Sequence, residues 1–186
     1  MESIVEIYAE ATPNPESMKY VANRMMLPND SADYRTADAT ENSPLAKALF
    51  ELPFVKGVFI MNNFVSITKN GDYEWFDLNN DLRDFLKEWL EAEKPIVEKK
   101  KVEFSEEEGN AIEIKIKQLL EDHVRPAVEM DGGAIDFKSF TDGVVTVQMK
   151  GSCSGCPSST MTLKSGIENL LKRMVPEVVA VEAEAV

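Results

Sequence analysis

The chain has 186 residues, of which 44% are hydrophobic and 28% charged, and this suits a soluble globular protein of one large domain or two small ones. Its 33 acidic residues outnumber its 20 lysines and arginines, which gives a formal net charge of −13. Because such a chain repels phosphate backbones, the composition argues against a nucleic-acid partner.

The first residues show no targeting pattern. Met1-Glu2-Ser3-Ile4 has no basic region, and no long apolar run follows it, so the sequence predicts no signal peptide and no membrane partner. Transit peptides are rich in arginine and poor in acidic residues, unlike this start. We therefore expect a reducing, cytoplasmic location, where a close cysteine pair is more often metal-binding or catalytic than a structural disulfide.

Three short strands are expected near the beginning of the chain. Residues 4–9 alternate between apolar and polar side chains, and residues 18–26 contain the β-branched and aromatic residues typical of a strand. Between them, Thr12-Pro13-Asn14-Pro15 breaks regular structure because proline lacks an amide donor. Residues 34–36 suit a third strand.

Two helices follow in the first half. Ser43 supplies a capping hydroxyl, Pro44 suits the first helical position, and Pro53 ends this helix. The second helix is expected to be capped by Asn79 or Asn80. Its apolar residues recur with the spacing of one helical face: Leu82, Phe85, Leu86, Trp89 and Leu90.

A hairpin is predicted between these helices. Residues 55–61 and 64–68 are apolar, β-branched runs separated by Asn62-Asn63. Asparagine tolerates the positive φ that so tight a turn requires.

Residues 93–109 differ in composition from both flanks. They are dominated by lysine and glutamate, which indicates a solvated linker with the domain boundary near residue 98. Ser105 and Glu108 form a capping box, and the helix behind it is expected to be kinked or ended by Pro126. Its apolar face comprises Ile112, Ile116, Leu119, Leu120 and Val124.

The remaining elements complete a small α+β unit in the order α-β-β-α-β. Residues 135–140 and 144–149 are predicted strands around the turn residues Asp142-Gly143. Ser158 or Ser159 is expected to cap the next helix, and residues 178–181 form a last strand in a three-stranded sheet. The helix is predicted to bury Met161, Leu163, Ile167, Leu170, Leu171 and Met174.

The loop Gly151-Ser152-Cys153-Ser154-Gly155-Cys156-Pro157 carries the only two cysteines of the chain. Its spacing places both sulfurs on one side of the loop, as in zinc and iron–sulfur proteins. The loop runs into a helix N-terminus, whose unpaired amides favour the thiolates that bind metal. Cys153 and Cys156 are therefore the candidate metal ligands.

The number of ligands falls short of what such a centre needs. Structural zinc and common iron–sulfur clusters take about four protein ligands, whereas this chain offers two cysteines and one histidine. His123 lies far along the chain and is expected to be a partly exposed helical residue. Two copies, each giving Cys153 and Cys156, would complete the set around a two-fold axis.

Two other uses of the cysteine pair remain open. A thioredoxin-like redox pair would follow a βαβ pattern and carry its proline between the cysteines, whereas here a hairpin precedes the pair and Pro157 follows it. A zinc-bridged structural dimer would use the same thiolates. Two plainly buried cysteines are disfavoured because serine and glycine, not apolar residues, surround them in the sequence.

Three separated motifs in residues 110–184 resemble the C-terminal domain of the NifU (Nfu) family. They are the runs from Leu120 to Gly133, from Gly151 to Glu168, and Val175-Pro176-Glu177-Val178. The first half resembles the Nfu N-terminal domain through Thr12-Pro13-Asn14-Pro15, Lys19-Tyr20, Ser43-Pro44-Leu45-Ala46, Leu49-Phe50 and the hairpin from Val58 to Lys69.

This resemblance implies a division into an Nfu N-terminal-like domain without cysteines (1–97), a linker (98–109) and a cluster-binding domain (110–186). It implies a non-enzymatic scaffold or carrier that holds a 4Fe–4S cluster between two subunits through Cys153 and Cys156, and passes it to apo-proteins. A 2Fe–2S cluster is also compatible with such ligands. The implied partners are a second copy, apo client proteins and an upstream assembly scaffold.

Overall fold

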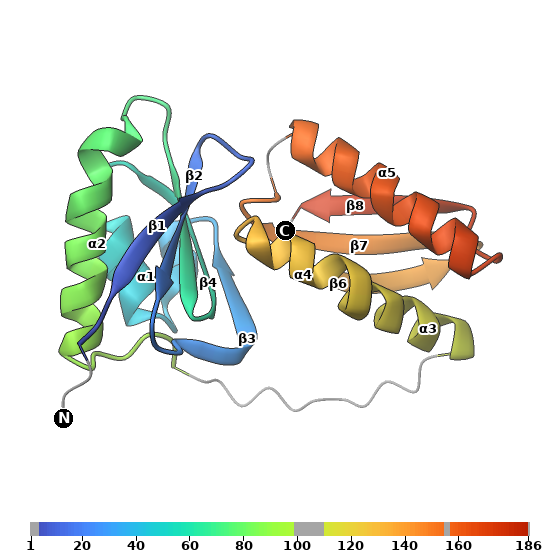
Figure 1. Cartoon of the computed structure of the whole chain (residues 1–186), viewed down its shortest axis with the longest axis horizontal. Helices are drawn as coiled ribbons and strands as arrows, with labels where there is room; N and C mark the ends of the chain where they lie inside the picture. The colour runs from blue at the N-terminus through green and yellow to red at the C-terminus, as the bar shows by residue number, and fades with distance from the viewer. Residues whose placement is uncertain (1–3, 99–109, 155–156, 186) are drawn as a thin grey trace. The chain divides into compact units, whose positions relative to one another are not determined.

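The computed structural model describes residues 4–98, 110–154 and 157–185. The chain divides into two compact units, Met1–Val102 and Glu103–Val186, and each has its own sheet (Figure 1). Mixed helices and strands in both units confirm the predicted α+β class. The exact boundaries 1–97, 98–109 and 110–186 stay a prediction, because residues 99–109 lie outside the described part. Among the described residues, no helix is both long and apolar enough to cross a bilayer.

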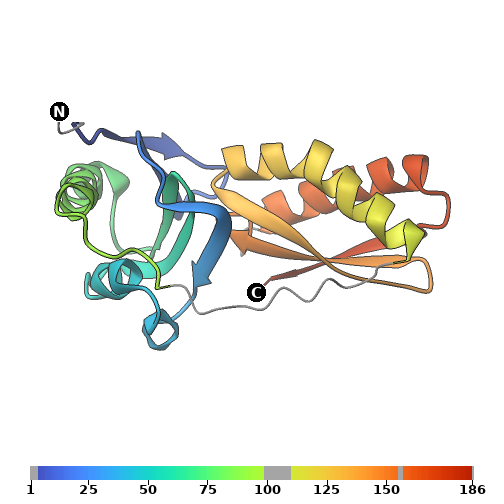
Figure 2. The ribbon, with the colours of Figure 1, turned by 90° about the horizontal axis from the view of Figure 1, so that it is seen from below.

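The N-terminal unit is built on a five-stranded antiparallel sheet in the order β1-β2-β5-β4-β3. Helices α1 and α2 cover one face of this sheet (Figure 2). The elements are β1 (Ile7–Ala11), β2 (Ser17–Ala22), β3 (Leu27–Tyr34), η1 (Ala37–Thr40), α1 (Pro44–Phe50), β4 (Val55–Asn62), β5 (Phe64–Lys69) and α2 (Trp75–Glu91).

Local signals explain α1 and the β4–β5 hairpin. The Ser43 hydroxyl accepts a hydrogen bond from the Ala46 amide at 3.1 Å, and Pro44 is the first helical residue, as predicted. Asn62 adopts a φ of 46° in the turn between β4 and β5. This confirms that an asparagine provides the positive φ of the tight turn.

Two elements of this unit differ from the prediction. Helix α2 begins at Trp75, so Asn79 lies inside the helix and accepts a 2.7 Å hydrogen bond from the Tyr20 hydroxyl instead of capping. Burial raises the pKa of Tyr20. Strand β3 begins at Leu27, not near residue 34, because pairing with β4 at the sheet edge holds a polar segment that local propensity does not favour.

The C-terminal unit is the predicted α-β-β-α-β arrangement with a three-stranded sheet, in the order β6-β7-β8. β6 and β7 are antiparallel, and β8 lies parallel to β7. All its helices lie on one face of the sheet (Figure 2). The elements are α3 (Ala111–Leu119), η2 (Leu120–Val124), α4 (Arg125–Met130), β6 (Gly133–Thr141), β7 (Val144–Gly151), α5 (Pro157–Met174) and β8 (Ala180–Ala185).

The first helix of this unit continues past its proline through an irregular turn. Pro126 has no amide to donate to the preceding turn, and the segment before it, η2, has π-helical hydrogen bonding. Asn110 caps α3 with its side chain. The predicted capping box at Ser105 and Glu108 lies outside the described residues.

The β6–β7 turn follows the sequence prediction closely. Asp142 and Gly143 have φ values of 51° and 80°, the positive values that a two-residue hairpin turn requires. This turn and a one-residue register shift between Phe137 and Ser139 together set the register in which Gly133 faces Gly151 at the opposite end of the hairpin.

Helix α5 and strand β8 need corrections. The helix begins at Pro157, so neither Ser158 nor Ser159 precedes it as a cap. Met161 and Met174 are 71% and 42% exposed and do not belong to the buried face. Met161 lies off the stripe formed by Ile167 and Leu171, and Met174 is the last residue of the helix. Strand β8 begins at Ala180, two residues after the predicted start, where pairing with β7 becomes available.

Glu168 ties α5 to β8. One carboxylate oxygen accepts a 2.6 Å bond from the Lys172 ammonium, and the other accepts a 3.1 Å bond from the Val181 amide. The hydrogen bond from Lys172, followed by that from Val181, lowers the pKa of the Glu168 carboxyl below its ordinary value of 4.5.

Replacing Glu168 with glutamine is expected to lower the free energy of unfolding at neutral pH. A carboxyl whose folded pKa is depressed contributes stability above its unfolded pKa and loses it as pH falls through the folded value. The difference between wild type and Glu168→Gln should therefore be largest at pH 7 and shrink toward pH 3, as measured by urea unfolding. Glu182→Gln, at an exposed position of β8, is the control. A difference of equal size at both pH values would contradict the role of the charge.

Candidate functional site

The cysteine loop joins the end of β7 to the start of α5. β7 ends at Gly151 and α5 begins at Pro157, which confirms the predicted strand–loop–helix context (Figure 1). Ser152, Cys153 and Ser154 are described, whereas Gly155 and Cys156 lie outside the described residues. The structure therefore locates one of the two predicted ligands.

The loop is held against the turn that follows α4. The Ser152 amide donates a 3.3 Å hydrogen bond to the Gly132 carbonyl, and the Ser152 hydroxyl donates to the Asp131 carbonyl. Gly132 and Gly151 have φ values of 78° and 67°, which L side chains rarely adopt. A turn 20 residues earlier in the sequence thus fixes the start of the cysteine loop.

The loop is also fixed on its helical side. The Thr160 hydroxyl, in the first turns of α5, donates a 3.2 Å hydrogen bond to the Cys153 carbonyl. Within the loop, the Ser154 hydroxyl donates to the Gly151 carbonyl at 3.1 Å. Serine and threonine side chains therefore bond loop backbone and help to orient Cys153 beside the N-terminus of a helix.

Cys153 is only 4% exposed and belongs to the apolar core of the C-terminal unit. The sequence argument against a buried cysteine, which rested on the neighbouring serines and glycines, is therefore wrong for Cys153. The reason is that the chain turns at Gly151 and packs Cys153 against residues that are distant in the sequence, so its spatial neighbours differ from its sequence neighbours. This core comprises Ile116, Leu119, Leu120, Val124, Val128, Ile135, Val145, Val147, Met149, Ile167, Leu171, Val175, Val178 and Val181.

His123 is not gathered with Cys153. It is exposed on η2, in agreement with the expected helical surface position. Among residues 4–98, 110–154 and 157–185, no group of three or more histidine, cysteine, aspartate or glutamate side chains is arranged to hold a metal ion.

Sequence reasoning did not assign a role to Gly133, Ser152 or Thr160. The segment Asp131-Gly132-Gly133 contacts the cysteine loop directly. Counting outward from the Asp142-Gly143 turn would place Gly133 opposite Ser152. An irregularity between Phe137 and Ser139 shifts the register by one residue, so that Gly133 pairs with Gly151, and no sequence signal predicted that shift.

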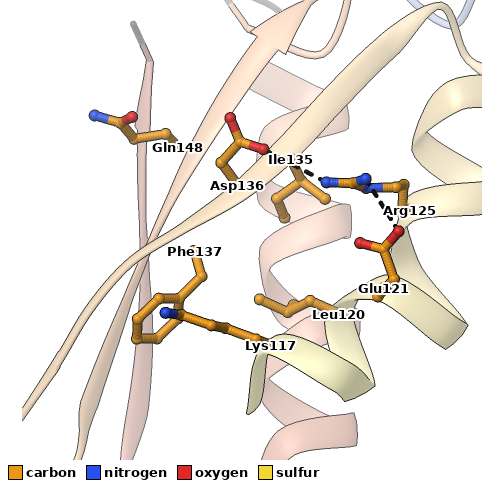
Figure 3. Close-up of a pocket in the computed structure, with 8 residues that line it drawn as sticks. All are labelled: Lys117, Leu120, Glu121, Arg125, Ile135, Asp136, Phe137 and Gln148. Carbon is orange, nitrogen blue, oxygen red and sulfur yellow. Dashed lines mark hydrogen bonds and ion pairs between the residues drawn. The ribbon is translucent and has the colours of Figure 1, made fainter. Parts of the chain in front are cut away.

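A pocket of about 500 Å³ lies elsewhere in this unit, between the α3–η2 helix and β6. Figure 3 shows the Arg125 guanidinium between Glu121 and Asp136, with Lys117 beside the Phe137 ring. Its lining residues are Lys117, Leu120, Glu121, Arg125, Ile135, Asp136, Phe137 and Gln148.

The charged side chains of this pocket pair mostly with one another, although the Nε of Arg125 is buried without a hydrogen-bond partner among the described residues. Arg125 bonds Glu121 at 3.0 Å and lies 3.7 Å from Asp136, and the Lys150 ammonium also contacts Asp136, at 2.5 Å. The Lys117 ammonium lies 5.1 Å from the centre of the Phe137 ring. The pocket therefore offers little unpaired charge to a ligand, and the cysteine loop is the better candidate.

Two protein-family models match this chain, one in each half. A family model described as "NifU-like domain" matches residues 116–182, and one described as "Scaffold protein Nfu/NifU N terminal" matches residues 7–93. A solution NMR structure of a NifU-like protein from Saccharomyces cerevisiae covers 54% of this chain and 92% of its own, with a TM-score of 0.48 and 23% identity.

Two relatives align with nearly the whole of this chain. The human NFU1 iron-sulfur cluster scaffold homolog, mitochondrial, is 38% identical over 95% of this chain and 70% of its own length. NifU-like protein 5, mitochondrial, of Arabidopsis thaliana is 37% identical over 96% of this chain and 67% of its own length.

These relatives contradict the expected cytoplasmic location, since they are named as mitochondrial proteins. That expectation rested on the composition of the first residues. The lack of a leader pattern in that stretch does not specify a compartment.

Two family models match the chain in the expected order, and the alignments with relatives extend across both units. These findings confirm the resemblance suggested by the three motifs in residues 110–184 and by the motifs of the first half. The chain belongs to the NifU-like family and combines an Nfu N-terminal domain with the NifU-like C-terminal domain.

Proposed function

We propose that this protein is a scaffold and carrier of iron–sulfur clusters, with Cys153 and Cys156 as the cluster ligands. The observation that carries the proposal is the position of the C-x-x-C pair between the end of β7 and the first turn of α5. Relatives named as iron–sulfur cluster scaffolds support it. The cluster is the cargo of the protein.

The loop suits thiolate ligands for a physical reason. The amides at the start of a helix and the positive end of its dipole stabilise negative charge, and the C-x-x-C pair directly precedes α5 in the sequence. Pro157 at the first helical position removes an amide that would have no intrahelical partner, and so costs nothing there. Soft thiolates are the ligands that iron–sulfur clusters use.

Two thiolates per chain lead to a shared cluster. Common clusters take about four cysteine ligands, so two copies supply a complete set. We propose a 4Fe–4S cluster, with a 2Fe–2S cluster equally able to use such ligands. A cluster held between two copies lies at an interface, where incoming ligands can reach it.

Transfer then proceeds by ligand exchange. Thiolates of an apo client protein replace those of Cys153 and Cys156 at iron, one iron–sulfur bond forming as another breaks. The displaced thiolates remain on the carrier as free Cys153 and Cys156, and no net oxidation or reduction occurs. The protein binds and passes on a cluster supplied by an upstream scaffold, and it catalyses no reaction of its own.

Anaerobic reconstitution with iron and sulfide tests this function against its two competitors. The expected product is brown, absorbs broadly near about 400 nm, and holds about four iron and four sulfide ions per pair of chains. A colourless product with one zinc ion per pair of chains would favour a zinc-bridged dimer, since zinc has no such absorption. A reversible disulfide between Cys153 and Cys156, without iron uptake, would favour thiol–disulfide exchange.

A further inference from the structure

The sulfur of Cys153 lies where a side chain at position 133 would otherwise be. A Cβ placed on Gly133 would be 2.7 Å from Cys153 Sγ and 3.1 Å from Cys153 Cβ. Packed protein interiors contain no such contact, because non-bonded carbon and sulfur atoms repel strongly at that separation. The bare Cα of Gly133 therefore forms one wall of the site that the thiol occupies.

The backbone conformation does not by itself explain this glycine. Gly132, Gly143 and Gly151 adopt positive φ values, whereas Gly133 is not among the residues that do. Any residue could adopt the strand conformation at position 133, which begins β6. Close approach of neighbouring atoms is the remaining physical reason for glycine here.

The loop has little freedom to move the sulfur away. On one side of Cys153, the Ser152 amide bonds the Gly132 carbonyl, next to the wall itself. On the other side, the Thr160 hydroxyl bonds the Cys153 carbonyl. A side chain at position 133 would have to break these contacts or push the thiol out of its site.

A second close contact defines the alternative. The same Cβ would lie 2.7 Å from the Lys150 carbonyl oxygen, in the strand that pairs with β6. If that contact alone mattered, Gly133 would serve the sheet, and its replacement would have the same effect with or without the sulfur.

We propose that Gly133 is a positioning residue for Cys153, and that the turn following α4 sets where this cluster ligand lies. The role as a ligand-positioning residue rests on the proposed function. The packing of the Cys153 thiol against Gly133 does not depend on that function, and it is measured in protein that holds no cluster. A failure of this packing proposal can therefore be told apart from a failure of the proposed cluster-binding function.

The first test is the reactivity of the Cys153 thiol with a disulfide reagent, in cluster-free Cys156→Ser protein. Because the Cys153 thiol is buried against Gly133, it should react far more slowly in folded protein than in the same protein unfolded in urea. Adding Gly133→Ala should raise its rate about tenfold or more, since overpacking destabilises the seated state. Gly166→Ala is the matched control, because a Cβ there meets nothing within 4 Å.

If the thiol of Cys156→Ser reacted equally fast in folded protein and in urea, this result alone would show that Cys153 is not packed against Gly133. Unchanged reactivity in folded Gly133→Ala would also overturn this packing.

The second test separates the sulfur from the Lys150 carbonyl. Gly133→Ala should destabilise the chain less when Cys153 is also alanine, because this removes the 2.7 Å contact with the sulfur and leaves the longer one with the Cβ of residue 153. Equal destabilisation in both backgrounds would assign Gly133 to the sheet alone. In reconstituted protein, Gly133→Ala should lose iron to a chelator faster than Gly166→Ala, and equal rates would overturn the role in holding the cluster.

Discussion

Reconstituted Cys153→Ser protein is expected to contain no iron–sulfur cluster. A hydroxyl is a poor ligand for iron compared with a thiolate, and one substitution removes two ligands when two copies share the cluster. Cys156→Ser should behave in the same way. Iron, sulfide and visible absorption, measured on anaerobic samples, should all fall to the background of untreated protein.

The fold should survive this change at a modest cost. Cys153 is buried in the core of the C-terminal unit, so a serine hydroxyl there leaves a polar group among apolar side chains, at a cost of about 1–3 kcal/mol. Urea unfolding and circular dichroism would show a cooperative transition at lower urea than in wild type. This separates loss of the ligand from loss of the structure.

Ser154→Ala is the control for the loop itself. It removes a hydroxyl that donates to the Gly151 carbonyl, but leaves both thiols in place. It should retain the cluster. A Cys153→Ser protein that still bound stoichiometric iron and sulfide would contradict the ligand assignment, and a folded Ser154→Ala protein without a cluster would show that the loop conformation is limiting.

Elements with strong local signals were predictable from the sequence. Ser43 and Pro44 define a helix start through one capping bond, and Asp142-Gly143 defines a hairpin through two positive φ values. Both signals act within a few residues and need no tertiary partner. The cysteine pair was recognisable for the same reason, since its spacing and the following Pro157 are local.

Elements that depend on distant partners were missed. β3 is polar and forms because β4 offers it an edge to pair with. Asn79 was expected to cap α2, but the helix begins at Trp75, and the Asn79 side chain instead accepts a hydrogen bond from Tyr20, which is distant in the sequence. Gly133 belongs to this class, since its contact with Cys153 exists only after the hairpin closes. Sequence periodicity reports which face is apolar, but not which distant atom lies against it.

The mass of the protein is expected to double when it takes up its cluster. The cluster-free chain, of 20.8 kDa, should sediment mainly as a monomer, because the shared cluster supplies the bonds that join two copies. Each copy carries a formal charge of −13, so two copies repel one another until iron bridges them. Added salt should therefore favour the loaded pair, since it screens this repulsion without touching the iron–sulfur bonds.

Sedimentation velocity on the same anaerobic sample, before reconstitution, after it, and after removal of iron by a chelator, measures this linkage. The larger species should appear with the visible absorption and vanish with it. The double variant Cys153→Ser/Cys156→Ser should stay monomeric through all three steps. A tight pair in cluster-free protein, or a full cluster on a single chain, would contradict the shared site. Because two copies hold one cluster, dilution should favour its loss, and a client protein can begin the exchange by displacing the two thiolates of one copy before it displaces those of the other.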